Sequence, residues 1–377
     1  MGVNRFGRTE WAGAFGDLGT LIPFVVAYVN LLGMDPAGIL LAFGIAKVCS
    51  GLFYRTPFPV QPMKAIGAAA TTQATQNFVV TPAAVYSAGL VTGVVWLVLA
   101  ASGLADRISR LTPKPVVAGI VLGLGLKFMG QGIGMMSTAW WLGLVSLAAA
   151  LLLLGNQRLP AMFVLLLLGA VVALIQHPDL VDRLADMHPH FRLPVYHLGA
   201  ITPEAFAGGA LLLALPQLPL TLGNALIAVT EENNELFPDR PVTERRVALT
   251  TGLMNLLAPV VGGVPMCHGA GGMAGHVRFG ARTGGALIIL GVALLVLALF
   301  FSGSVMVLLS YFPKAVLGVI LFLAGAQLAL GALKVAPENA PRFVAAVTTG
   351  FALWNVGAAF VAGLILHHLL RRGWVKL

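Results

Sequence analysis

The chain has 377 residues, of which 58% are hydrophobic and only 10% are charged, and its formal net charge is +9. An ordinary soluble domain carries about 25% charged residues, so this composition excludes a water-soluble globule. A membrane-spanning helix needs roughly 20 apolar residues, and the chain holds many such runs. Residues 142–154 are apolar on every face, which excludes the alternating strands of a β-barrel. We therefore expect an all-α integral membrane protein, and the positive charge does not indicate a nucleic-acid partner.

Apolar runs bounded by Pro, Gly or charged residues predict twelve full-length spans. They cover residues 13–32, 36–53, 82–103, 115–135, 138–155, 160–176, 205–230, 243–261, 283–302, 313–333, 341–355 and 356–370. Two further stretches, 62–76 and 265–277, are too short and too rich in Gly and Ala to cross alone. We expect each to be a half-helix that starts inside the membrane after an extended strand, 56–61 or 262–264. Strand and half-helix together make one discontinuous span, so the prediction is fourteen spans.

The two halves of the chain resemble each other at a nearly fixed offset. The matched segments are 113–116 with 313–316, 62–63 with 265–266, and 18–19 with 222–223. Seven spans in each half is an odd number, so the second half must be inverted relative to the first. Inverted repeats of this kind are typical of transporters.

The distribution of Lys and Arg predicts the orientation, because these residues accumulate in cytoplasmic loops. Most of the 23 basic residues fall on one side of the predicted spans, together with both termini. We therefore expect a multi-pass protein of the cell membrane with both termini in the cytoplasm. The polar segment 1–11 is followed by no cleavage signature, so the first span should be retained.

No cofactor or metal is expected from the sequence. Cys49 and Cys267 lie in apolar or Gly-rich segments, so neither a disulfide framework nor a zinc site is indicated. The predicted outer loop, 176–202, contains four scattered histidines without metal-ligand spacing, and a solvated loop is the simpler interpretation.

The first candidate site is Gly-Asp-Leu-Gly-Thr-Leu-Ile-Pro at 16–23, where the first long apolar run begins. An acid within a span is a functional candidate, because burying a carboxylate at the bilayer centre costs about 2.5–3.5 kcal/mol. Asp17 lies near the membrane interface, so capping a helix is the alternative role. Gly16 and Gly19 allow a second backbone to approach closely.

The second candidate site is residues 57–70, in which three prolines forbid a continuous helix and favour extended backbone. Pro62 suits the first turn of the helix that follows. A helix that begins within the membrane presents free N–H groups and a positive dipole end to a midplane cavity. Lys64 opposes that dipole unless an anion binds there. A structural ion pair between Lys64 and Asp17 is the alternative.

The third candidate site, 262–272, is the repeat mate of the second. Its glycines allow backbone N–H groups to approach a ligand. Cys267 and His268 occupy the aligned places of Lys64 and Ala65. For His268, a functional role and a structural one both remain open.

The fourth candidate site, 215–224, is the mate of the Asp17 segment. Gln217, Thr221 and Asn224 recur at helical spacing on one face. This polar stripe either faces a ligand or makes interhelical hydrogen bonds. Glu231, in the acidic run that follows, is a candidate coupling residue with Asp17 and His268, and a solvated charge run is its alternative.

Together these segments predict an anion site, because two half-helix N-termini would point at one another beside a lysine. Moving one unit charge into a dry interior costs roughly 20 kcal/mol in the ideal case, so a dianion requires many fixed donors. The predicted substrate-binding residues are Gly19, Thr20, Gln61, Met63, Lys64, Ala65, Gln217, Thr221, Asn224, Cys267, His268 and Gly269.

The segments 16–23, 59–65, 217–221 and 267–272 resemble those of the sulfate/molybdate transporters related to plant and algal molybdate permeases. Such proteins are distant relatives of the sulfate-permease and nucleobase-permease transporters. The resemblance implies a seven-plus-seven inverted fold with a core domain (1–110 and 203–310), a gate domain (111–202 and 311–377) and often a homodimer. Few residues follow the last predicted span, so we expect no cytoplasmic regulatory domain.

We therefore expect a secondary transporter, not an enzyme, that moves molybdate, or alternatively sulfate, by alternating access. The alternative class is an anion channel or an uncoupled anion facilitator. The chain contains no nucleotide-binding loop of the GxxxxGK[ST] type, so ATP drive is not indicated. Molybdate, sulfate and tungstate are all tetrahedral dianions, and the pattern fits all three.

Overall fold

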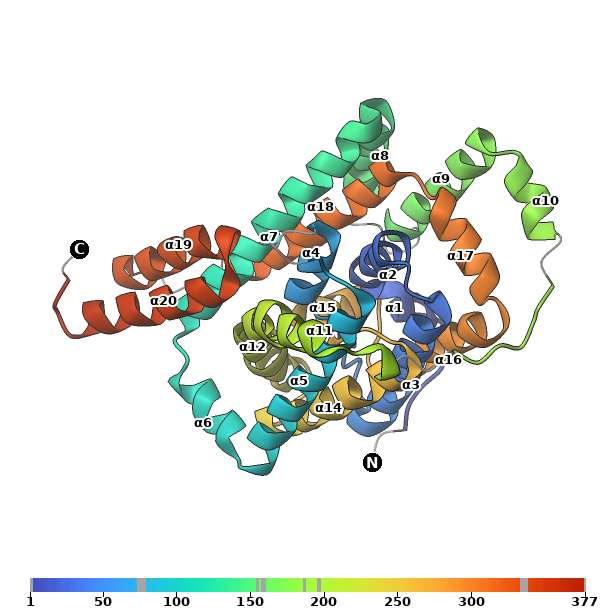
Figure 1. The fold of residues 1–377 in the computed structure, drawn as a ribbon. Coiled ribbons are helices and arrows are strands. Elements are labelled where there is room, and N and C mark those ends of the chain that lie inside the picture. Colours follow the sequence, from blue (N-terminus) through green and yellow to red (C-terminus); the bar gives the residue numbers. More distant parts are fainter. Residues whose placement is uncertain are drawn as a thin grey trace.

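The computed structural model describes residues 3–72, 79–153, 156, 161–185, 188–194, 198–332 and 338–375. Most of the described residues lie in helices (Figure 1).

The first half of the chain begins with α1 (Arg8–Ala14), the 3₁₀ turn η1 (Phe15–Asp17) and α2 (Leu18–Leu32). It continues with α3 (Pro36–Tyr54), strand β1 (Gln61–Pro62), α4 (Lys64–Thr72), α5 (Pro82–Ala101), α6 (Leu104–Leu111), α7 (Lys114–Met136), η2 (Ser137–Ala139), α8 (Trp140–Leu153), α9 (Ala161–Gln176) and α10 (Asp179–Ala185).

The second half begins, after the turn η3 (Leu198–Ala200), with one helical run made of α11 (Pro203–Gly208), η4 (Gly209–Ala214), α12 (Leu215–Leu220), η5 (Thr221–Ala228) and α13 (Val229–Leu236). It continues with α14 (Glu244–Leu257), η6 (Ala258–Val261), strand β2 (Met266–Cys267), α15 (Ala270–Arg278), α16 (Gly285–Phe300), α17 (Ser302–Tyr311), α18 (Lys314–Ala332), α19 (Asn339–Trp354) and α20 (Val356–Arg371). The segments η4 and η5 are π-helical.

The predicted full-length spans all coincide with helices or helical runs, which confirms the all-helical fold. The sequence did not predict α6, α10 or α17. The first two are short and carry charged residues, so their mean hydropathy falls below that of a span. By length and composition, 4 of the described helices can cross a membrane, or 6 if each of two bent pairs is one span.

The two half-helices begin later than predicted. α4 starts at Lys64 and α15 at Ala270, because Pro62 and Met266 belong instead to a short antiparallel strand pair. The predicted strands 56–61 and 262–264 are correspondingly shifted toward the helices. The predicted end of the first half-helix, residues 73–76, lies outside the described residues.

Several helix pairs join the two halves of the chain. α7 packs on α18 and α19, α3 on α16 and α5 on α14, and Figure 1 shows α7 and α18 running side by side. A Cβ atom added at Gly125 would lie 2.7 Å from the carbonyl oxygen of Gly325, and one at Gly325 would lie 2.6 Å from that of Gly125. Gly125 and Gly325 are related by the same offset as the matched segments 113–116 and 313–316, so this reciprocal contact is the pattern that a two-fold relation between halves produces.

We expect Gly125→Ala to destabilise the protein, because the new methyl group meets the backbone of α18. Overpacking of this kind costs about 1–3 kcal/mol. Gly134→Ala on the same helix is the matched control, since a Cβ there meets nothing within 4 Å and Ala favours helix over Gly by about 1 kcal/mol. Thermal unfolding in detergent should show a lower midpoint for Gly125→Ala alone, and equal midpoints would contradict the close α7–α18 contact.

Candidate functional site

The candidate site is built around the point where β1 meets β2. Pro62 pairs with Met266 and Gln61 with Cys267, and the backbone N–H of Met63 donates to the carbonyl of Pro265 at 2.9 Å. The predicted repeat mates, 62–63 and 265–266, therefore lie directly against each other. From this crossing, α4 and α15 begin, as the sequence predicts for two half-helices.

Side chains from neighbouring helices bind the extended backbone that leads into both half-helices. The hydroxyl of Ser50 donates to the carbonyl of Phe58 at 2.7 Å, and the Lys47 ammonium donates to that of Val60 at 2.7 Å. The Asn255 side chain accepts from the N–H of Met266 at 2.9 Å and donates to its carbonyl at 2.6 Å. Backbone polar groups at membrane depth need such partners, because lipid supplies none.

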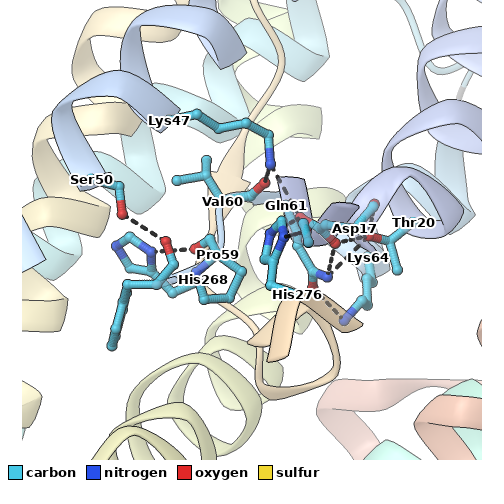
Figure 2. Close-up of polar contacts among 12 residues, drawn as sticks. Asp17, Thr20, Lys47, Ser50, Pro59, Val60, Gln61, Lys64, His268 and His276 are labelled. Atoms are coloured by element: carbon cyan, nitrogen blue, oxygen red, sulfur yellow. Dashed lines mark hydrogen bonds and ion pairs between the residues drawn. The ribbon is translucent and has the colours of Figure 1, made fainter. Parts of the chain in front are cut away.

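Asp17 lies at the centre of a buried polar cluster (Figure 2). Its Oδ2 atom is 3.1 Å from the Lys47 ammonium, and both side chains are at most 1% exposed. Its Oδ1 atom accepts from the Gln61 amide and from the Thr20 hydroxyl, each at 2.5 Å. Nε2 of His276 is 3.9 Å from Oδ2. Asp17 occupies the N-cap position of α2, but its side chain makes no cap hydrogen bond. The structure therefore contradicts the capping role, and the pair with Lys47 contradicts a direct pair with Lys64.

Lys64 belongs to the same cluster but does not contact Asp17 directly. Its buried ammonium donates to Oε1 of Gln61 at 3.0 Å. Since Nε2 of the same amide donates to Asp17, Gln61 connects the carboxylate of η1 to the lysine of α4. The predicted residues Asp17, Thr20, Gln61 and Lys64 therefore form one connected network.

Gln217 caps the start of the first half-helix from across the repeat. Its Oε1 atom accepts from the backbone N–H groups of Ala65 at 2.8 Å and Ile66 at 3.4 Å. Its amide donates to the hydroxyl of Thr221 at 2.9 Å. The polar stripe of 215–224 thus makes interhelical contacts and points at the helix terminus that the sequence predicts as an anion site.

The remaining predicted residues lie around the same crossing. A Cβ at Gly269 would overlap Oε1 of Gln61 and lie 3.1 Å from the Asn224 amide nitrogen, so this position has no room for a side chain. Met63 directly follows β1 and Cys267 lies in β2, and the two residues are buried at 0% and 2% exposure. Gly19 lies in the first turn of α2.

A narrow cleft opens beside Lys64. It is lined by Thr20, Phe24, Lys64, Phe128, Gly271, Ala324, Gln327 and Leu328. Thr20, Lys64 and Gly271 come from the predicted core domain, and Gly271 lies in the first turn of α15. Phe128 and Gln327 come from α7 and α18 of the predicted gate domain. Of these lining residues, Lys64 is the one with a charged side chain.

His268 lies away from this cleft. Its Nδ1 atom is 2.7 Å from the carbonyl of Pro59 and its Nε2 atom is 2.8 Å from the Thr250 hydroxyl. The ring also packs edge-on against Phe58 and Tyr54. Both ring nitrogens are therefore bonded within the protein, which favours the structural interpretation.

Glu231 likewise lies outside the buried cluster. Its carboxylate is 2.9 Å from the ammonium of Lys114, and the two side chains are 57% and 79% exposed. This exposure agrees with the alternative interpretation of Glu231, in which the acidic run is a solvated group of charges and not a coupling site. The pair nevertheless joins α7 to α13, which belong to different predicted domains.

Sequence reasoning missed Lys47 and His276 as members of the cluster. Both are ionisable residues within segments predicted to lie in the membrane, and that position alone is a signal of function. Among the described residues, no group of three or more His, Cys, Asp and Glu side chains could hold a metal ion.

Comparison with known proteins places the chain in a family. The family described as "Molybdate transporter of MFS superfamily" matches residues 9–128 and 209–328. These two segments are separated by the same offset as the matched segments at 113 and 313.

Relatives in plants and algae match along almost the whole chain. Molybdate transporter 1 of Arabidopsis thaliana is 33% identical, with 99% of this chain and 90% of the relative covered. Molybdate transporter 2 of the same plant is 32% identical over 96% of this chain and 87% of its own length. Molybdate transporter 1 of Chlamydomonas reinhardtii is 29% identical over 95% of this chain and 90% of its own.

Solved structures of transporters are also similar in fold. The transmembrane domain of the cyanobacterium bicarbonate transporter BicA has a TM-score of 0.64 at 16% identity, over 94% of this chain and 97% of that one. Murine solute carrier 26 family member A9, an anion transporter in the inward-facing state, has a TM-score of 0.72 at 12% identity, over 100% of this chain and 70% of that one. Since the family match and the relatives cover most of the sequence, this chain belongs to the molybdate transporter family.

Proposed function

We propose that this chain is a secondary transporter that carries molybdate across the cell membrane by alternating access. The observation that carries this proposal is the position of Lys64, whose buried ammonium lies in the first turn of a half-helix and lines the central cleft. A cation at a helix N-terminus is unfavourable, since that end of the helix dipole is positive. A bound oxyanion offsets both the charge of the Lys64 ammonium and the positive end of the helix dipole.

The donors around the cleft suit a tetrahedral dianion. Lys64, Thr20 and Gly271 in the first turn of α15 line the cleft from the predicted core domain. The Thr20 hydroxyl donates to Asp17, whereas the Lys64 ammonium has three N–H donors, of which one is bonded to Gln61. The N–H groups of Ala65 and Ile66 are bonded to Gln217, so an anion that reaches the start of α4 must displace that carbonyl. Fixed donors of this kind replace part of the hydration that a dianion loses on entry.

The proposed alternating access assigns different roles to the predicted core and gate domains, which both contribute residues to the cleft. In this proposal the core (1–110 and 203–310) carries the anion, and it moves against the gate (111–202 and 311–377). The fourteen-span inverted topology, with both termini in the cytoplasm, and a homodimer belong to the same proposal. The similarity in fold to the two anion transporters supports it.

Uptake of labelled molybdate by liposomes that contain the purified chain tests the proposal. A secondary transporter should show saturable uptake, and unlabelled molybdate on the opposite side should accelerate the exchange of label. Sulfate and tungstate added as competitors measure selectivity among dianions. Flux that rises linearly with concentration and ignores substrate on the opposite side would support an anion channel instead, and protein-free liposomes are the control.

A further inference from the structure

His276 is a buried titratable residue that the proposed anion site does not use. It lies in α15 at 0% exposure, beside the Asp17–Lys47 pair. Close packing of α15 on η1 holds it there, since a Cβ at Gly16 would lie 2.5 Å from the carbonyl carbon of Gly275. The position of the ring relative to Asp17 is therefore fixed by backbone contact, and Figure 2 shows the two side chains next to each other.

The hydrogen bonds of His276 determine where its proton is. Nδ1 lies 2.7 Å from the carbonyl oxygen of Gly13, and because a carbonyl only accepts, Nδ1 must carry the hydrogen. In the neutral ring, Nε2 is then an unprotonated nitrogen with a free lone pair. Nε2 has no hydrogen-bond partner among the described residues, and the group it faces is Oδ2 of Asp17 at 3.9 Å.

Two acceptors facing each other in a buried site are unfavourable. A proton on Nε2 converts that contact into an ion pair, in which the imidazolium donates toward the Asp17 carboxylate. The charged side chains that interact with the ring are Asp17 of η1, which packs on α15, and Lys47 of α3. The Asp17 carboxylate favours a proton on the ring, and the Lys47 ammonium opposes it. Glu10 of α1 instead accepts from the backbone N–H groups at 282, 283 and 286, and Glu231 of α13 pairs with Lys114.

Charge balance connects this position to the anion cleft. Lys47, Lys64 and Asp17 together carry one net positive charge, whereas a dianion brings two negative charges. A proton on His276 raises the cluster to two positive charges, so that the anion and the cluster balance. The contacts His276 to Asp17, Asp17 to Gln61 and Gln61 to Lys64 run from the ring to the cleft.

We infer that Nε2 of His276 is a proton-binding site whose occupation is coupled to anion binding in the cleft. This inference rests on the proposed function, since it takes the anion to bind beside Lys64. Coupling between two binding sites is reciprocal: if the proton favours the anion, the anion favours the proton. Molybdate binding should therefore take up a proton, and its affinity should fall as the pH rises.

Isothermal titration of molybdate into the purified full chain in detergent tests the coupling. Measurements between about pH 5 and 8, the range in which histidine ordinarily titrates, in buffers of different ionisation enthalpy, report the protons taken up. For the wild type we expect uptake of up to one proton per molybdate and an affinity that falls by up to about tenfold per pH unit as the pH rises.

His276→Asn is the matched variant, because its amide can still donate to the carbonyl of Gly13 while Nε2 is removed. It should bind molybdate without proton uptake and with a flattened pH dependence. His268→Asn is the comparison variant, a second buried histidine whose nitrogens are both bonded, and it should retain the uptake. If His276→Asn does not fold, His276→Gln replaces it. Molybdate-dependent proton uptake that persists in the folded His276 variant overturns the inference.

The outcomes separate this inference from the proposed function. If the wild-type protein binds molybdate with no net proton uptake in any buffer, the proton site is wrong but the proposed transporter function stands. Protein that binds no molybdate at any pH overturns the proposed function itself.

Discussion

Lys47→Met is expected to destabilise the protein by about 3–5 kcal/mol, the range for breaking one partner of a buried ion pair. The change leaves the Asp17 carboxylate buried without its cation, and both side chains are at most 1% exposed. It also removes the donor to the carbonyl of Val60. Unfolding in detergent, followed by circular dichroism, should show a much lower midpoint than the wild type.

Two further variants show whether the loss comes from the unpaired charge. Lys47→Met combined with Asp17→Asn should recover most of the stability, because neither member of the ion pair is then left charged without its partner, and the asparagine oxygen can still accept from Gln61 and Thr20. Lys114→Met is the matched control, since its pair with Glu231 is exposed and such pairs contribute about 0–1 kcal/mol. Equal midpoints for Lys47→Met and Lys114→Met would contradict the buried pair.

The helices could be predicted from sequence because the bilayer demands long apolar runs, and prolines and glycines mark their ends. The crossing of the half-helices was predictable for the same reason. Three prolines before Lys64 forbid a helix there, and the repeat mate at 265 repeats the break. The strand register was not predictable, because it depends on which residues of two distant segments come into contact.

The ion-pair partner of Asp17 could not be predicted from the sequence. The sequence offers two lysines within predicted spans, Lys47 and Lys64, and spacing along the chain does not distinguish them. The choice is made by the packing of α3 beside the extended segment, which brings Lys47 to both the Val60 carbonyl and Asp17. The position of His276 depends in the same way on the contact between Gly16 and Gly275.

Gln217 shows a related case. The polar stripe of Gln217, Thr221 and Asn224 was visible in the sequence. However, either a ligand or another helix could supply the hydrogen-bond partners of these side chains. In the structure its carbonyl binds the N–H groups of Ala65 and Ile66. The stripe therefore serves the first half-helix directly, and its role toward an anion depends on whether that carbonyl can be displaced.

Lys64→Gln is expected to weaken molybdate binding by about 10- to 150-fold, which corresponds to the roughly 1.5–3 kcal/mol of a hydrogen bond to a charged group. Glutamine keeps much of the length and a donor toward Gln61 but removes the positive charge from the cleft. Lys314→Gln is the control, because Lys314 is an exposed lysine in the first turn of α18. Isothermal titration with molybdate measures both variants, and wild-type affinity in Lys64→Gln would remove this residue from the site.

The double variant Lys64→Gln with Asp17→Asn separates a role in anion binding from a role in neutralising Asp17. If Lys64 served to neutralise the carboxylate, removing both charges together should restore binding. The structure pairs Asp17 with Lys47 instead, so the second change leaves Lys47 as an unpaired buried cation. We therefore expect the double variant to bind molybdate no better than Lys64→Gln and to unfold at a lower temperature, whereas recovery of wild-type affinity would show that Asp17 and Lys64 act as a pair.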